Sequence, residues 1–221
     1  DNALPFGGMP SIDDRSLCHI ILLEDLGYAL SPVANEDQML KKAAQEQLIE
    51  LSEIDPAQTN KRDRKEGYLG FSYPANAVWR FWAFGAMRRN ELTIREFKVR
   101  WANLFSVLHN GTLQEMWNAE PGTTAQMSHC PVGPNIAMHR CLLGLRMFNG
   151  QDGDLRPDLA GLKKFEITSY IPAGAIHFKH TSLPDRTRWE ILPPMDARLE
   201  IVLPTGERKA LKQGMPNVFE F

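Results

Sequence analysis

Residues 74–89 read PANAVWRFWAFGAMRR. Pro74 occupies the position that proline favours at the start of a helix, because the N–H that proline lacks would be unpaired there anyway. The apolar and aromatic residues that follow predict a dense helix as far as about Arg89. Trp79 and Trp82 in this helix, like Trp101 after it, lie at helical spacing, which favours a place in a hydrophobic core over a role as sugar platforms.

Helical spacing of apolar residues extends to both sides of this segment, from about residue 15 to residue 147. Residues 15–30 predict a helix that is covered on most sides. A second helix is expected over residues 35–54, opened by Asn35 and Gln38 as a capping pair. A capping box at residues 93–96 predicts a further helix, and Pro134 is expected to start a last one that ends near Met147. Antiparallel hairpins are the simplest packing for such a series.

The pattern changes beyond residue 164 to short β-type runs separated by Pro, Gly and Asp. These runs are FEITSY, GAIHFKH, RTRWEIL, ARLEIVL and NVFEF. They predict a small antiparallel sheet or half-sandwich that packs on the helices, since it is too small to be very stable alone. The expected organisation is therefore a mainly α protein, with helical hairpins over residues 1–150 and a C-terminal β-domain over residues 151–221.

The composition excludes several classes of protein. The chain is 43% hydrophobic and 24% charged, with a formal net charge of −2 and charges of both signs interspersed. It has neither the basic stripe that nucleic-acid binding needs nor an apolar run long enough to span a membrane. The three cysteines form no CxxC spacing, so structural zinc is not expected, and no cofactor is implied.

The compartment stays open at the level of sequence. The chain begins with Asp1 rather than Met, which indicates a processed or truncated product whose targeting segment could be missing. A secreted or periplasmic location is favoured over a cytoplasmic one.

Residues 110–133 form a long, chemically rich segment that reads NGTLQEMWNAEPGTTAQMSHCPVG. Long loops in compact domains are usually functional or disordered, and the aromatic residues and glycines here favour function. The segment supplies a carboxylate, a tryptophan, an asparagine and a histidine. Hydrolysis of a glycosidic bond requires carboxyl groups of this kind across the bond, together with aromatic and hydrogen-bonding groups around the sugar.

Residues 112–118, TLQEMWN, resemble the T-x-W-E-x-W-(D/N) segment of α-L-rhamnosidases, with Gln114 in place of the first tryptophan. Residues 127–129, MSH, are similar to a histidine-containing element that follows in those enzymes, although the histidine falls somewhat earlier here. The ending LEIVLPTGERKALKQGMPNVFEF, residues 199–221, resembles the strand pair that closes their C-terminal β-domain. The resemblance covers most of residues 66–221.

The resemblance implies the C-terminal part of an (α/α)-toroid, or six-hairpin, glycoside hydrolase that cleaves a terminal, rhamnoside-like glycoside by inversion. In that family the glutamate of the quoted segment is the general base, a role that falls on Glu115. Residues expected to contact the substrate are Trp117, His129, Asp14, Tyr73 and Asn118. Fewer helices are predicted than a complete toroid has, so we expect exposed apolar helix faces and a second chain, or a second copy of this one, as partner.

Other interpretations remain open. Glu115 is alternatively a solvated loop carboxylate, His129 a polar loop residue, and Asp14 an N-cap residue of the first helix. A non-catalytic carbohydrate-binding or scaffold protein on a degenerate toroid would share the same pattern. So would a glucosidase, a trehalase or an inverting phosphorylase of the same architecture.

Overall fold

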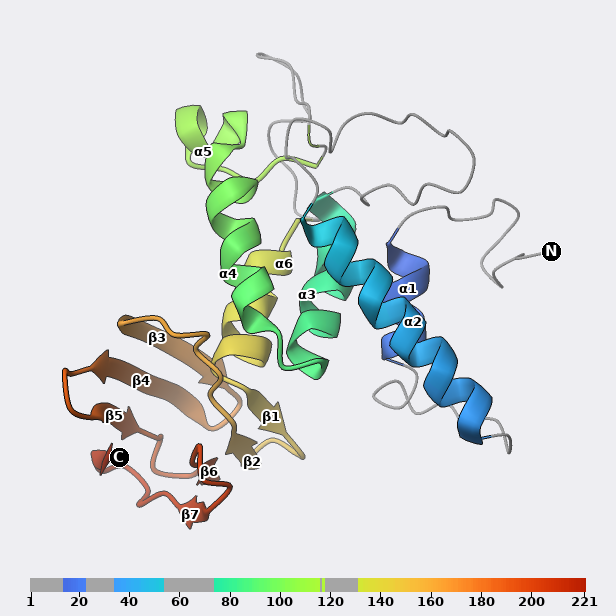
Figure 1. Cartoon of the computed structure of the whole chain (residues 1–221). Coiled ribbons are helices and arrows are strands. Elements are labelled where there is room, and N and C mark those ends of the chain that lie inside the picture. Colours follow the sequence, from blue (N-terminus) through green and yellow to red (C-terminus); the bar gives the residue numbers. More distant parts are fainter. Residues whose placement is uncertain (1–13, 23–33, 54–73, 116, 118–130) are drawn as a thin grey trace, which may run out of the picture. The chain divides into compact units, whose positions relative to one another are not determined.

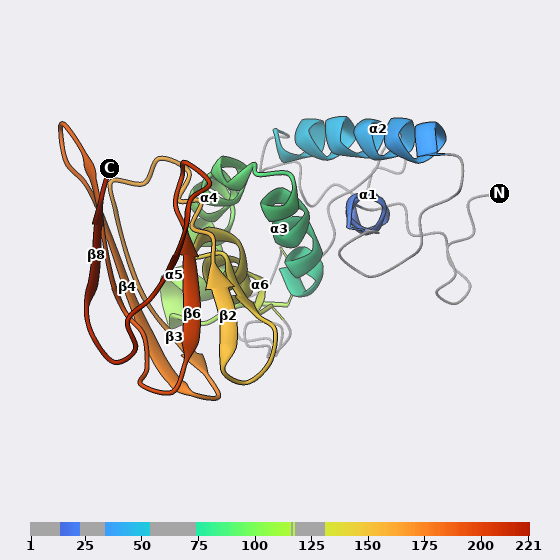
Figure 2. The ribbon, with the colours of Figure 1, turned by 90° about the horizontal axis from the view of Figure 1, so that it is seen from below.

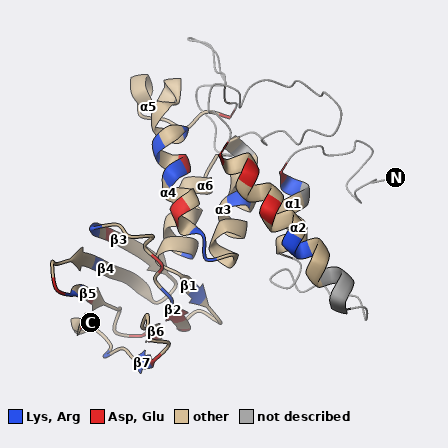
Figure 3. Ribbon diagram, in the orientation of Figure 1, with Lys and Arg blue, Asp and Glu red and all other residues tan. Residues whose placement is uncertain are grey.

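The computed structural model describes residues 14–22, 34–53, 74–115, 117 and 131–221. The chain divides into two compact units, Asp1–Asn135 and Ile136–Phe221 (Figure 1). No helix in the described ranges is long and apolar enough to cross a membrane. Charged residues of both signs are spread over both units (Figure 3).

The described part of the first unit is helical. Its elements are α1 (Arg15–Ile21), α2 (Ala34–Ser52), η2 (Pro74–Asn76), α3 (Ala77–Ala86), α4 (Asn90–Val99), η3 (Trp101–Asn103), α5 (Phe105–Asn110) and α6 (Gly133–Ile136). The predicted start at Pro74 is confirmed, since it opens the short 3-10 turn that leads into α3. The helix expected over residues 35–54 is confirmed by α2.

The core of this unit forms around α3, which packs against α1 and α4. Phe81 and Phe84 have no exposed surface. The Phe81 ring lies edge-on to Phe97 at 5.2 Å and tilted against Trp101 at 5.9 Å. Trp101 is 4% exposed, which confirms its predicted place in the core. Apolar residues three to four positions apart thus bury one face of α3.

The second unit begins with η5 (Ala137–Leu142), a stretch of π-helix, and continues as strands. The strands are β1 (Leu145–Met147), β2 (Asp152–Leu155), β3 (Lys164–Ile171), β4 (Gly174–Ser182), β5 (Thr187–Leu192), β6 (Arg198–Val202), β7 (Arg208–Ala210) and β8 (Asn217–Glu220). They form two four-stranded sheets, with the orders β1-β2-β6-β7 and β3-β4-β5-β8. The five strands expected from the sequence are confirmed as β3, β4, β5, β6 and β8.

Alternation along the strands builds the core of the second unit. Buried residues alternate with more exposed ones on β4, β5 and β6, as expected when one face of a sheet is covered. The buried set comprises Ile176, Phe178, Trp189, Ile191, Leu199 and Ile201. Figure 2 shows the two sheets as two layers.

The predicted fold class is wrong. The protein is not mainly α, because the described part of the chain contains eight strands in two sheets beside its helices. The described helices do not show a toroid either. The expectation that the β-domain is purely antiparallel is also wrong, since β2 and β6 pair in parallel, from Asp152 opposite Arg198 to Leu155 opposite Ile201. A parallel pair needs a long crossover, and here the chain between β2 and β6 supplies it by forming β3, β4 and β5 of the other sheet.

The helix expected to run from Pro134 to Met147 ends earlier. It continues through η5 only to Leu142, and Leu145–Met147 is strand β1. Gly144 lies between them with φ at 67°, a left-handed conformation that stops a helix and that glycine adopts without strain.

Candidate functional site

The segment that carries Glu115 leaves the end of α5 through a tight turn. Gly111 takes φ at 64°, in the left-handed region typical of the residue after a helix. The chain then folds back along α5. The N–H of Thr112 donates to the carbonyl of Ser106 at 3.2 Å, and the hydroxyl of Ser106 donates to the carbonyl of Thr112 at 2.8 Å. The beginning of the segment is therefore fastened to the helix before it.

Gln114 fastens the next part of the segment. Its side chain is fully buried, where an amide needs partners for both its oxygen and its nitrogen. The Oε1 atom accepts from the N–H of Ser106 at 3.0 Å, and Nε2 donates to the carbonyl of Trp117 at 2.8 Å. In the resembled motif a tryptophan stands at this position, so the departure supplies hydrogen bonds in place of an aromatic ring.

Trp117 is the second anchor. It is 9% exposed, and its ring lies edge-on to that of Trp101, with 5.7 Å between centroids and 76° between planes. Glu115 stands between the two anchors, and it is exposed. A carboxylate in this position can reach solvent while its backbone is held from both sides.

A buried charged cluster is linked to this segment through Trp101. Arg80 on α3 has no exposed surface, and its guanidinium binds the carboxylates of Asp14 and Glu96. Its Nε atom donates to Oε2 of Glu96 at 2.8 Å and its Nη2 atom to Oε1 at 2.5 Å, a two-pronged pairing. The indole N–H of Trp101 donates to the same Oε1 atom at 3.2 Å.

Electrostatics keep Arg80 and Glu96 ionised. Burial favours the uncharged form of Arg80, but the carboxylates of Asp14 and Glu96 outweigh it and raise the pKa of Arg80 above its usual value. Burial likewise acts to raise the pKa of Glu96, and the Arg80 charge outweighs it, so this pKa lies below its usual 4.5. For Arg100 the balance differs, because burial lowers its pKa more than Glu96 raises it.

The structure describes three of the predicted site residues. Glu115 and Trp117 lie in the anchored segment after α5. Asp14 takes the N-cap position of α1, as the alternative interpretation expected, but its carboxylate makes no capping hydrogen bond and binds Arg80 instead. A substrate contact by Asp14 stays a prediction. His129, Tyr73 and Asn118 lie outside the described residues.

Sequence reasoning missed three residues of this region: Arg80, Glu96 and Gln114. A signal for Arg80 was present, since it is the only charged residue within the apolar run of α3. Glu96 was assigned to a capping box with Thr93, and that prediction is wrong. The helix α4 begins at Asn90, so both residues lie inside it and are buried.

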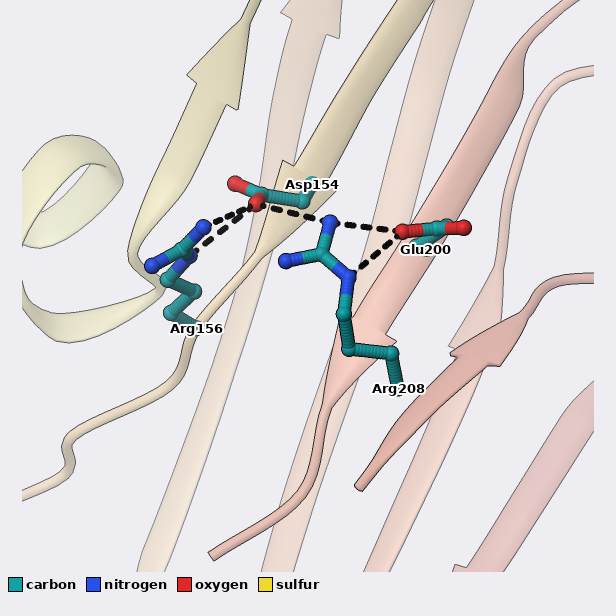
Figure 4. A network of polar contacts seen from close by, with 4 residues as sticks. All are labelled: Asp154, Arg156, Glu200 and Arg208. Carbon is teal, nitrogen blue, oxygen red and sulfur yellow. Dashed lines mark hydrogen bonds and ion pairs between the residues drawn. The ribbon is translucent and has the colours of Figure 1, made fainter. Parts of the chain in front are cut away.

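The second unit carries another charged network, drawn in Figure 4. Asp154 has no exposed surface, and its Oδ2 atom accepts from Arg156 at 2.9 and 2.7 Å and from Arg208 at 3.3 Å. Arg208 also donates twice to Glu200, at 2.8 and 2.6 Å. The parallel pairing of β2 and β6 places Asp154 opposite Glu200. The network therefore ties β2, β6 and β7 together.

Comparison with known proteins gives results for structure only. No family model matches the chain, and no curated protein is similar to it in sequence. Among solved structures, the GH78 family rhamnosidase of Bacillus sp. GL1 is similar with a TM-score of 0.60 and 16% identity, over 86% of this chain and 19% of that one. The α-L-rhamnosidase from Aspergillus terreus is similar with a TM-score of 0.62 and 17% identity, over 98% of this chain and 25% of that one.

These likenesses show a fold shared with part of two glycoside hydrolases. The chain spans about a fifth to a quarter of the length of those structures.

Proposed function

We propose that the chain is part of a glycoside hydrolase that cleaves a terminal, rhamnoside-like glycoside by inversion, with Glu115 as the general base. The observation that carries the proposal is the exposed carboxylate of Glu115, held between the anchored residues Gln114 and Trp117. The fold shared with part of two α-L-rhamnosidases supports it.

The chemistry follows from the position of Glu115. In an inverting reaction the base takes a proton from water while the water oxygen bonds to the anomeric carbon and the glycosidic bond breaks. A second carboxyl group, about 6.5–9.5 Å away, gives its proton to the leaving oxygen. Because Asp14 and Glu96 are buried and bound to Arg80, we assign the acid to another residue. A base on a fixed backbone needs little reorganisation in the transition state.

We also propose that the sugar is bound by residues around Glu115. These are Trp117, Asn118 and His129 from the same long segment, with Tyr73 and Asp14 from the segments that precede the helices. A contact by Asp14 would require its pairing with Arg80 to open, so we expect this residue to contribute least. No cofactor is needed for this chemistry.

The test is hydrolysis of aryl glycosides, with the configuration of the first-formed sugar followed by proton NMR. We expect release of a terminal deoxysugar such as rhamnose, with the anomeric configuration inverted. Retention would contradict the mechanism, because a retaining enzyme needs a nucleophilic carboxylate only about 5–5.5 Å from the acid. Release of another sugar, or a requirement for inorganic phosphate, would favour a glucosidase, a trehalase or a phosphorylase instead.

A non-catalytic carbohydrate-binding protein is the second candidate. It is favoured by the fact that Asp14 and Glu96, two carboxylates of the helical unit, are both bound to Arg80. Binding of the glycoside in calorimetry by the complete protein, without any hydrolysis, would support this candidate and contradict the enzyme.

A further inference from the structure

We propose that Glu96 is a positioning residue for the segment that carries Glu115, and that it acts through Trp101 and Trp117. The placement of the segment follows from contacts within the helical unit alone. Its consequence for catalysis rests on the function proposed above.

Glu96 is itself held rigidly. Both of its carboxylate oxygens accept from Arg80, and the side chain is 1% exposed. A rotation of Glu96 would leave the buried Arg80 charge without one of its two partners, which is strongly unfavourable in a low-dielectric environment. The position of Oε1 is therefore fixed.

Trp101 takes its orientation from that oxygen. Its indole N–H donates to Oε1 of Glu96, and its ring contacts those of Phe81 and Trp117. Ring contacts alone are compatible with a flipped indole, whereas the hydrogen bond selects one orientation. Trp101 opens η3, one residue beyond the C-cap of α4, so the bond fastens the start of η3 to α4.

Trp117 connects the fixed position of Trp101 to the segment that carries Glu115. Its ring packs edge-on against Trp101, and its carbonyl accepts from Gln114. Gln114 in turn is bound to the backbone of Ser106 on α5. The backbone on either side of Glu115 is thus fixed by two routes, one from α5 and one from Glu96.

Asp14 offers a matched comparison. It binds the same Arg80 guanidinium and is equally buried, but the indole N–H of Trp101 is given to Glu96. Replacing either carboxylate by its amide removes one partner of Arg80. Only the change at Glu96 also disturbs the bond that orients Trp101.

The test is hydrogen exchange followed by mass spectrometry on wild type, Glu96→Gln and Asp14→Asn under native conditions. We expect both variants to lose global stability, while exchange in peptides covering residues 106–117 rises by about tenfold or more only in Glu96→Gln. Equal exchange of these peptides in both variants, or no rise in either, would overturn the inference. If Glu96→Gln does not fold, Trp101→Phe replaces it, since phenylalanine keeps a ring and removes the N–H.

A kinetic arm separates this inference from the proposed function. In Trp101→Phe we expect kcat to fall by about tenfold or more while KM changes little, because small misplacements of a catalytic group act on the transition state. An unchanged kcat in this variant, with Glu115 shown to be essential, would overturn the catalytic part of the inference. If Glu115→Gln keeps its turnover, the proposed function fails, while the exchange data still test the placement of residues 106–117.

Discussion

The guanidinium of Arg80 has no exposed surface, and its two carboxylate partners come from α4 and from the residue before α1. A single side chain thus joins segments that are far apart in the sequence. Removing one partner of a buried ion pair leaves an uncompensated charge and typically costs about 3–5 kcal/mol. A large share of the stability of the helical unit should therefore depend on the pairing of Arg80 with its two carboxylates.

Acid should destabilise the helical unit through Glu96. Its pKa is lowered in the folded protein, so the unfolded chain takes up the proton first as the pH falls. The stabilisation is present above the unfolded value of about 4.5 and is lost as the pH drops through the folded value. Urea midpoints measured between neutral and acid pH should fall in this range. At neutral pH the Glu96→Gln variant should be less stable than the wild type by about 3 kcal/mol. Its urea midpoint should also depend less on pH. The same dependence of the urea midpoint on pH in both proteins would contradict this assignment.

A second residue-scale prediction concerns two histidines on β4. His180 is buried, and its Nδ1 atom accepts from the indole N–H of Trp189 at 3.0 Å while Nε2 donates to the carbonyl of Leu162 at 2.6 Å. His180→Phe leaves a buried donor and a buried acceptor unpaired, so thermal unfolding should show a loss of about 2–4 kcal/mol. His177 on the same strand is exposed and bonds to Thr168. His177→Phe should change stability by less than about 0.5 kcal/mol. Equal losses in both variants would contradict the role of the buried bonds.

At the scale of elements, the junction of η5 and β1 depends on Gly144. An added Cβ there would lie 2.1 Å from the carbonyl oxygen of Arg156, in addition to the strain of a left-handed backbone. Gly161 has a similar φ of 73°, but an added Cβ would meet nothing within 4 Å. Gly161→Ala should therefore lose about 1–2 kcal/mol, the cost of the left-handed conformation alone. Gly144→Ala should lose clearly more, or fail to fold, in urea unfolding of both variants. Similar losses of stability in the two variants would show that the backbone at the junction can move away from the added Cβ.

The strands differ in how well the sequence predicts them. Alternating β-branched and aromatic residues identify β3, β4 and β5, because this pattern fits a half-covered sheet. The strand β2 reads DGDL, and Asp and Gly are depleted in strands. It forms through its parallel pairing with β6 and the bonds of Asp154 to arginines. Such contacts between distant segments leave no local pattern, so β1, β2 and β7 could not be predicted.

For the candidate site, too, only a part could be predicted from the sequence. The segment around Glu115 could be identified, because its residue types occur together in a short motif. Its anchoring could not, since Gln114 acts through Ser106 and Trp117, and Trp117 through Trp101. The lone arginine in an aromatic helix was the one visible sign that a buried pairing had to exist.

At the scale of the whole molecule, we propose that the chain associates with a second chain or with a copy of itself. Met39 and Leu40 on α2 are 73% and 52% exposed, and Leu108 on α5 is 64% exposed. Large apolar side chains exposed on helices favour association. Light scattering should give a mass above that of one chain, and it should decrease on dilution. A constant monomer mass across concentrations would contradict association with a copy, and a constant monomer mass of the complete protein would contradict the proposal as a whole.

The most direct test of the central proposal is the turnover of Glu115→Gln on an aryl glycoside. Glutamine keeps the size of the side chain but cannot accept a proton from water, so the fold and KM should change little while kcat falls by about 10²–10⁴-fold. Glu207→Gln is the control, since Glu207 is an exposed carboxylate in the second unit, paired with Lys209, and its replacement should leave kcat unchanged. If Glu115→Gln keeps turnover within a few-fold of wild type, Glu115 is not the base and the proposed function is contradicted.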